Sequence, residues 1–219
     1  MDPSFWINRW KDNQIGWQQE STNPLLIRYW DKLNLPPHSN VLVPCCGKSL
    51  DMIFLSKKNF NVTGIELSEE ACSSFFEENK IPYVIEKKPL FKKFISSNIT
   101  LYNGDLFDMT LQDFPKYAGI YDRAAIIALP QEMRARYAKH ITSLSTVTPQ
   151  TKMLLLSLEF DGKKRPPPPH SVSEKEIREI YSNFNIKPLY RKNIIDEEEK
   201  FKSCDIQTLE ETIFLLEKI

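Results

Sequence analysis

Glycine and histidine are scarce in this sequence, with six glycines and three histidines in 219 residues. A dinucleotide site uses the closely spaced glycines of G-x-G-x-x-G to bring backbone against a pyrophosphate, and the one suitable turn here contains only Gly47. The composition therefore argues against a dehydrogenase. The histidines, His38, His140 and His170, lack the spacing of metal ligands, so no metal site is expected. His170 follows a run of prolines and could face a substrate.

Long apolar runs and cysteine pairs are missing as well. No apolar stretch approaches the roughly 18 residues that a membrane-spanning helix needs, and no signal peptide is recognisable. The four cysteines form no C-x-x-C pair, which argues against zinc and disulfides and favours a reducing cytoplasm. Lysine plus arginine and aspartate plus glutamate both total 29, so neither nucleic acid nor a membrane is expected as the main partner. Nothing suggests more than a monomer.

The stretch NVLVPCCGKSLDMIFL, residues 40–55, reads as the first half of a βαβ unit. Its apolar start predicts a buried strand, which Pro44 ends. Gly47 then allows a tight turn, and Ser49 is a candidate N-cap for the helix that follows. The amino end of that helix would face whatever binds there.

A second strand is predicted over residues 61–67, and it ends on the acidic side chain of Glu66. Glu66 follows Gly47 at close to the offset of about 20 residues at which an acidic side chain meets a ribose hydroxyl in such folds. The alternative is that Glu66 only ends a strand and faces solvent.

Further strands alternate with helices along the chain. Strands are predicted at residues 99–106, 119–123, 152–160, 186–194 and 208–216. Helices are predicted from residue 4 until Ile15 breaks the pattern, at 23–33, from 68, and at 130–144 and 173–181. This alternation predicts an α/β fold with a mostly parallel sheet, and the last two strands, joined without a helix, suggest an antiparallel final strand. Cys45, Glu66, Asp105 and Arg123 all fall at carboxyl ends of strands, where open α/β sheets bind ligands.

Three segments fit this scheme less well. Residues 81–98 look like an insertion, in which residues 81–85 could be a short strand and the basic FKKFISS a turn of surface helix. Residues 161–170 (DGKKRPPPPH) are too rich in proline for regular structure. The acidic run at 196–200 reads as a solvated loop.

Tryptophan is concentrated near the start of the chain. Trp6 and Trp10 share one face of a helix for which Ser4 is a candidate cap, and Trp17 follows it. This helix either docks on the core or forms an aromatic lid over a flat heterocycle. We expect one domain over residues 1–219, with residues 1–37 as the helical lid and residues 38–219 as the sheet core.

A phosphate site is the main alternative, because Gly47-Lys48-Ser49 precedes a helix and Asp122 could hold a metal ion. The P-loop pattern, however, needs a glycine where this chain has Leu42. A ligand with adenosine but without phosphate suits a loop with one glycine better, since Glu66 can accept from the ribose. S-adenosylmethionine is such a ligand.

The strings VPCCGKSLDM, GIELSEEA, IYDRAAIIALP and MRARYA resemble the thiopurine S-methyltransferase family, whose motif reads VPLCGKS-DM. The resemblance covers the whole chain, including the tryptophan-rich start and the proline-rich segment. It implies the Rossmann-like class I methyltransferase fold, with seven strands, an antiparallel last strand and helices on both faces. It also implies methyl transfer from S-adenosylmethionine to the sulfur of aromatic or heterocyclic thiols, leaving S-adenosylhomocysteine. Methylation of selenium or tellurium species, as in metalloid detoxification, is the alternative on this scaffold.

The resemblance also implies roles for particular residues. The cofactor would be surrounded by Trp10, Cys45, Glu66 and Arg123, with the backbone at Asp105 and Leu106 reading adenine and Trp17 near the substrate. Asp105 could instead only end a strand or cap the next turn. The chain departs from the family at Cys45, where leucine is usual, and at Lys200 and Asp205, where arginine and glycine are usual.

Methyl transfer needs little covalent help from the protein, because positioning in a water-poor pocket accounts for much of the rate. Arg123 would act by orientation and electrostatics, and no general base is required. Alternatively, Arg123 could form an ion pair with Asp122 or Glu66. Cys45 and Cys46 are expected to be inert packing residues. Two functions of other classes remain, a nucleotide hydrolase and a non-catalytic protein that binds S-adenosylmethionine.

Overall fold

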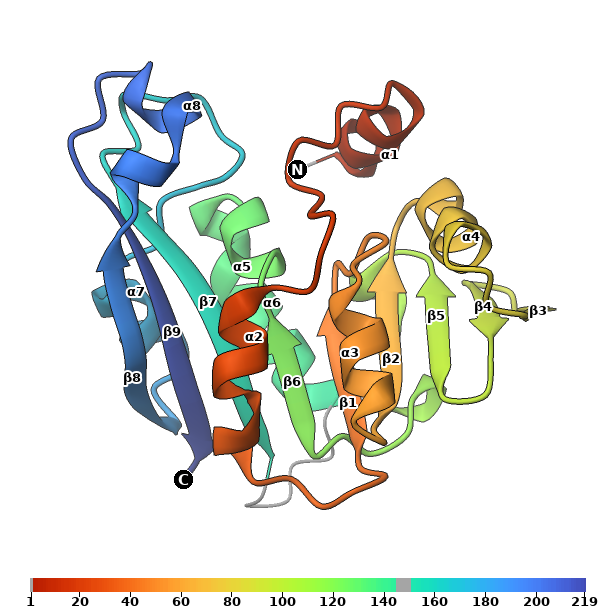
Figure 1. Ribbon diagram of the computed structural model, residues 1–219. Helices are drawn as coiled ribbons and strands as arrows, with labels where there is room; N and C mark the ends of the chain where they lie inside the picture. Colours follow the sequence, from red (N-terminus) through yellow and green to blue (C-terminus); the bar gives the residue numbers. More distant parts are fainter. Residues whose placement is uncertain (1, 145–150) are drawn as a thin grey trace.

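The computed structural model describes residues 2–144 and 151–219, which form one mixed sheet with helices on both faces (Figure 1). The strands are β1 (Asn40–Pro44), β2 (Asn61–Glu66), β3 (Val84–Lys87), β4 (Lys92–Ile95), β5 (Ile99–Asn103), β6 (Gly119–Asp122), β7 (Lys152–Phe160), β8 (Phe184–Asn193) and β9 (Leu209–Lys218). Their order is β3-β4-β5-β2-β1-β6-β7-β9-β8. The neighbours from β5 to β7 are parallel, and β9 is antiparallel to both β7 and β8. The predicted parallel sheet with an antiparallel last strand is confirmed.

The core lies in two layers, one on each side of the sheet. The helices are α1 (Pro3–Lys11), α2 (Pro24–Tyr29), α3 (Asp51–Lys57), α4 (Glu69–Glu78), α5 (Ala125–Ala128), α6 (Gln131–Leu144), α7 (Glu174–Ile180) and α8 (Glu199–Lys202), with short 3-10 turns η1 (Trp30–Leu33), η2 (Leu106–Asp108), η3 (Leu111–Asp113) and η4 (Ile195–Glu197). Because side chains alternate along a strand, Val41 and Val43 pack with α2, α3 and α4, whereas Leu42 packs with α5, α6 and α7. Ile120 and Tyr121 divide in the same way.

The described sheet has nine strands rather than seven, because a hairpin of β3 and β4 extends the edge beyond β5. The prediction of a surface helical turn at FKKFISS is therefore wrong. Phe94 of β4 is buried beside Leu101 of β5 and stacks near Phe76 of α4. Side chains alternate between the two faces of a strand, and the strand Lys92–Ile95 therefore places Phe94 in the core.

Two helices begin at residues other than those predicted. Asp2 caps α1 in place of Ser4, because Pro3 occupies the first helical position and the Asp2 carboxylate accepts from the Ser4 N–H at 2.8 Å. Helix α3 begins at Asp51, and Ser49 lies outside it, accepting from the Asp51 N–H at 3.2 Å. The loop after β1 is therefore longer than the sequence suggested.

Residues 196–200 are largely exposed, as predicted, but they form short helical turns instead of the predicted loop. This segment contributes to η4 and α8, whose Ile195 and Phe201 are buried with Phe160 in a small separate cluster. The rings of Phe160 and Phe201 meet edge to face at 5.1 Å. Two apolar side chains flanking the acidic run hold these short helices against the end of β7.

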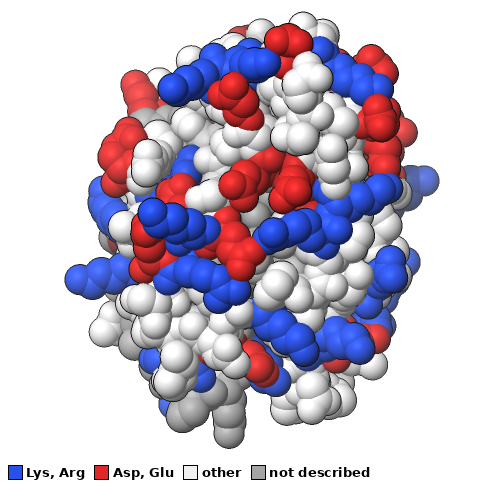
Figure 2. All heavy atoms as spheres, turned by 90° about the vertical axis from the view of Figure 1, so that its left-hand side faces the viewer, with Lys and Arg blue, Asp and Glu red and all other residues white. Residues whose placement is uncertain are grey.

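Charges of both signs are interspersed on the face that carries the β8 edge (Figure 2). Arg191 of β8 pairs with Glu174 and Glu210, and Arg178 pairs with Glu174 at 2.7 Å. No large field of one sign covers this face. Among the described residues, none of the helices is both long and apolar enough to cross a bilayer.

Candidate functional site

Glu66 is a buried side chain at the edge of the sheet where the parallel strands end. It is 6% exposed at the end of β2, and its carboxylate accepts from the Gly47 N–H at 2.9 Å and the Ser68 N–H at 2.7 Å. Burial raises the pKa of Glu66, and these backbone hydrogen bonds oppose the rise. The alternative of a solvent-facing strand end is therefore wrong. An ionised carboxylate has about four acceptor positions, so the backbone N–H groups of this loop do not use all of them and acceptor capacity remains for a ligand.

Helix α1 covers the loop between β1 and α3 with the side chain of Trp10. Gly47 has a left-handed φ of 52°, and a Cβ there would lie 3.0 Å from Cζ2 of Trp10. Trp10 is 7% exposed. Cys45 also has a left-handed φ, 47°, and burial raises the pKa of its thiol, so it remains a neutral packing group. Trp17 is partly exposed and meets Trp10 edge to face at 6.0 Å.

Gly47→Ala is expected to destabilise the protein by about 1–2 kcal/mol and to loosen Trp10. The added methyl group combines an unfavourable φ with a close contact to the indole, and either alone is costly. Gly162→Ala is the matched control, because its Cβ would be 3.6 Å from Ser171 Cβ, an ordinary contact. Urea unfolding checks both variants, and equal shifts in their midpoints would contradict the prediction.

Asp105 and Leu106 lie at the next strand end, where β5 runs into η2. The Asp105 carboxylate accepts from the Phe107 N–H at 2.9 Å and so caps η2. The carbonyl of Leu106 accepts from His140 Nε2 at 2.7 Å, an interaction that the sequence did not suggest. In the described part of the chain the Leu106 N–H has no hydrogen-bond partner. This backbone donor is available to a flat heterocycle.

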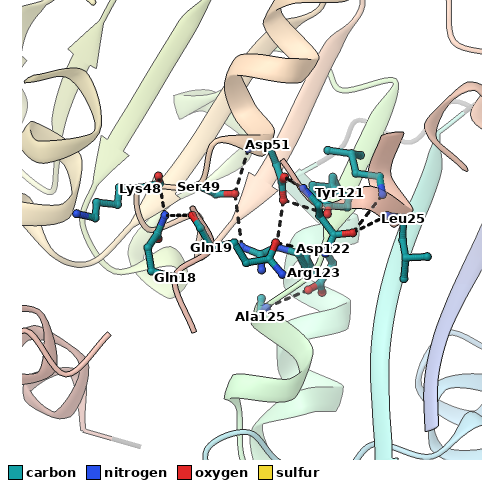
Figure 3. Close-up of polar contacts among 12 residues, drawn as sticks. Gln18, Gln19, Leu25, Lys48, Ser49, Asp51, Tyr121, Asp122, Arg123 and Ala125 are labelled. Carbon is teal, nitrogen blue, oxygen red and sulfur yellow. Dashed lines mark hydrogen bonds and ion pairs between the residues drawn. The ribbon is translucent and has the colours of Figure 1, made fainter. Parts of the chain in front are cut away.

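Arg123 directly follows β6 and forms an ion pair with Asp51, the first residue of α3 (Figure 3). Its Nε lies 3.1 Å from Asp51 Oδ2, and its Nη2 lies 3.5 Å from Ser49 Oγ. The suggested ion pair with Asp122 or Glu66 is wrong. Asp122 instead accepts from the Tyr137 hydroxyl at 2.7 Å and from two N–H groups of α5, and burial raises its pKa to about 6.

Asp51 is the functional candidate that the sequence reasoning missed. It sits four residues before Leu55 on the buried face of α3 and is only 1% exposed. A carboxylate on the apolar face of an amphipathic helix is a recognisable signal, since such a group needs a charged or hydrogen-bonding partner. Its partner Arg123 comes from a distant strand and could not be read from local sequence.

The loop does not form a phosphate cradle. Lys48 Nζ pairs with Glu78 Oε1 of α4 at 2.6 Å, which turns its charge away from the loop. The Lys48 carbonyl accepts from the Gln18 side chain at 3.2 Å (Figure 3). Ser49 Oγ faces Asp51 and Arg123. The parts of a P-loop are therefore committed to other contacts.

The proline-rich segment and α8 lie beside the site rather than in its centre. Lys164 pairs with Asp205 at 2.9 Å, and the Arg165 guanidinium lies 4.6 Å from the Phe201 ring centroid, so the two segments are joined. Lys200 Nζ lies near Gly16, 3.3 Å from the position that a Cβ atom would take at this glycine. His170 borders a separate cavity of about 210 Å³, with its Nε2 buried and unpartnered in the described residues.

Several solved structures with this architecture are methyltransferases. A SAM-dependent methyltransferase from Anabaena variabilis superposes with a TM-score of 0.68 at 14% identity, over 99% of this chain and 95% of that chain. A 1,6-didemethyltoxoflavin-N1-methyltransferase from Burkholderia thailandensis, solved with S-adenosylhomocysteine, gives 0.64 at 13% identity, over 99% and 86%. The fold is that of the class I S-adenosylmethionine-dependent methyltransferases.

Sequence comparison identifies the family within that class. The family described as thiopurine S-methyltransferase (TPMT) matches residues 1–219. A probable thiopurine S-methyltransferase of Yarrowia lipolytica is 39% identical over 213 residues, 96% of this chain and 97% of that protein. A thiopurine S-methyltransferase of Pseudomonas fluorescens is 37% identical over 98% of both chains. The chain belongs to the thiopurine S-methyltransferase family, which confirms the resemblance.

Proposed function

We propose that this enzyme moves the methyl group of S-adenosylmethionine to the sulfur of an aromatic or heterocyclic thiol, as in thiopurines. Its family and its relatives support this reaction. The observation that carries the proposal is buried Glu66, which is joined to the Gly47 loop under Trp10 and keeps acceptor positions for a ribose. The donor set suits a nucleoside without phosphate.

Each predicted site residue has a place in this proposal. Glu66 would accept from the ribose hydroxyls, and the Leu106 N–H, beside Asp105, would donate to adenine. The turn at Cys45 and Gly47 would hold the amino acid end of the cofactor, with Trp10 packed over the loop. These assignments use the acceptor capacity that Glu66 keeps beside its backbone hydrogen bonds and the N–H group of Leu106 that η2 leaves without a partner in the described residues.

The cofactor supplies an electrophilic methyl group, and the new carbon–sulfur bond forms as the sulfonium bond breaks. The residues of this chain then have to position the thiol, exclude water and balance charge. Trp17 offers a flat apolar wall, and Arg123 can face a thiolate because two of its N–H groups are occupied by Asp51 and Ser49 while others remain. An aromatic thiol that is already ionised needs no general base.

The other functions receive less support. Nucleotide hydrolysis conflicts with the ion pair between Lys48 and Glu78, which removes the cation a phosphate would need. The family comparisons favour the thiol substrate over selenium or tellurium species. A monomer in the cytoplasm stays a prediction, as does the use of residues 1–37 as a lid over one domain.

Ligand-induced thermal stabilisation and a turnover assay test the function together. We expect S-adenosylmethionine, but not ATP with magnesium, to raise the melting temperature. Transfer of a labelled methyl group should occur with thiophenol and 6-mercaptopurine, and more slowly or not at all with selenite. Stabilisation by ATP alone would contradict the assignment, and binding without turnover of any acceptor would favour a non-catalytic role.

A further inference from the structure

Asp51 joins three segments that are distant in the sequence. Its Oδ1 accepts from the Asn23 N–H at 2.8 Å, and its Oδ2 accepts from the Tyr121 hydroxyl at 3.1 Å and lies 3.1 Å from Arg123 Nε. Figure 3 shows Tyr121 and Arg123 converging on this carboxylate from β6 and the residue after it. The Asp51 side chain is 1% exposed and the Arg123 side chain 15%. Asp51 is thus a buried junction beneath the strand-end site.

The contact fixes the direction of the Arg123 side chain. A guanidinium is planar, so an acceptor at Nε and another at Nη2 define its plane. Ser49 supplies the second, weaker contact at 3.5 Å. No other hydrogen bond to Arg123 occurs in the described residues, so its remaining N–H groups are free to meet a bound molecule. Without Asp51, a long and flexible arginine would sample several rotamers.

The same carboxylate holds the segment that follows the tryptophans. Asn23 donates its N–H to Asp51 and caps α2, with its side chain accepting from the Leu25 N–H at 2.9 Å. Upstream, Gln18 donates to the Lys48 carbonyl. The segment between Trp17 and α2 is therefore attached at one end to the loop before α3 and at the other end to the first residue of α3. Asp51 lies where this segment and Arg123 meet.

We propose that Asp51 is a positioning residue that sets the direction of Arg123 and fixes the chain between Trp17 and α2 over the same site. This inference rests on the proposed methyl transfer and goes beyond it. Asp51 does not touch the substrate. It acts through Arg123, so its effect on turnover depends on the presence of the arginine.

A double-mutant cycle tests this dependence. Asp51→Asn keeps an acceptor for the Asn23 N–H but removes the charge opposite Arg123. We expect it to lower kcat/KM for thiophenol about 10-fold in the wild-type background and less than about 2-fold in an Arg123→Gln background, because coupled residues are not additive. Asp51→Asn should also raise the melting temperature of the Arg123→Gln protein, since it removes a buried charge that has lost its partner.

Asp31→Asn is the matched control, because Asp31 pairs with Lys58 at 2.8 Å on the surface. In each background, its kcat/KM should equal that of the parent protein without the Asp31→Asn substitution. Equal losses of kcat/KM from Asp51→Asn in the two backgrounds, with lower melting temperatures in both, would show that Asp51 is only a structural residue. That result would overturn this inference and leave the proposed function untouched. A wild-type protein that neither binds S-adenosylmethionine in calorimetry nor methylates any thiol would overturn the proposed function, and this inference with it.

Discussion

Glu66→Gln should weaken the binding of S-adenosylmethionine by about 10- to 100-fold. The two carboxylate oxygens accept from the Gly47 and Ser68 N–H groups, and an amide has only one oxygen, so its NH₂ would face a backbone donor. The variant also loses the charge that assists the proposed hydrogen bonding to the ribose. One charge-assisted hydrogen bond is worth about 1.5–3 kcal/mol, and 1.4 kcal/mol corresponds to tenfold in affinity. Isothermal titration calorimetry measures the dissociation constant directly.

Glu70→Gln provides the control, because Glu70 is exposed on α4, four residues further along the chain. Acidification gives an independent check. Since burial raises the pKa of Glu66, the ionised form is lost as the pH falls through a value above the ordinary 4.5. Wild-type affinity should be full above that pKa and decline below it, whereas Glu66→Gln should lack this decline. The same acid profile in both proteins would contradict the role of Glu66.

The local part of the site could be predicted from the sequence. Val41 to Pro44 form a strand, Gly47 turns the chain, and Glu66 ends the next strand, because short apolar runs and turn residues act over a few positions. Parallel pairing of β1 with β2 then brings Gly47 to Glu66 without any further information. The position of Glu66, the carboxylate proposed to face the ribose, therefore follows from strand order alone.

The long-range contacts could not be predicted in this way. Arg123 has Asp122 as its acidic neighbour in sequence and Asp51 as its ion-pair partner, and the choice of Asp51 over Asp122 depends on side-chain direction. Asp122 at the end of β6 accepts from Tyr137, so its carboxylate is already occupied on the opposite layer of the sheet. Period-two alternation separates neighbouring side chains onto opposite faces, but the sequence does not say which α-helix supplies the partner.

The position of α8 was missed for a related reason. Its charged sequence is typical of a loop. The helix is held by contacts of the Phe201 ring with the Phe160 ring and with the Arg165 guanidinium. Those partners lie at the end of β7 and in the proline-rich segment. Tertiary packing thus decided the structure of a four-residue helix that has little intrinsic stability.

Arg123→Lys should lower kcat/KM for an aromatic thiol by about 100-fold, a typical effect of losing one positioned electrostatic group. Lysine keeps the charge and can still pair with Asp51, so the protein should remain folded. Its single ammonium cannot contact Asp51 and also present further donors in a fixed plane, as the guanidinium does. Steady-state kinetics with thiophenol, together with the melting temperature, measures the two effects separately.

Arg191→Lys is the matched control for this substitution. Arg191 also pairs with carboxylates, Glu174 and Glu210, but it lies on the edge strand β8, away from the carboxyl end of β6. Its activity should stay within about 2-fold of the wild type, because an exposed pair contributes about 0–1 kcal/mol and only to stability. If Arg123→Lys kept more than half of the wild-type activity, charge alone would suffice, and the fixed plane of the guanidinium would have no part in catalysis. If both variants lost activity equally, the loss would reflect a general effect of the substitution, and Arg123 would have no special place in the site.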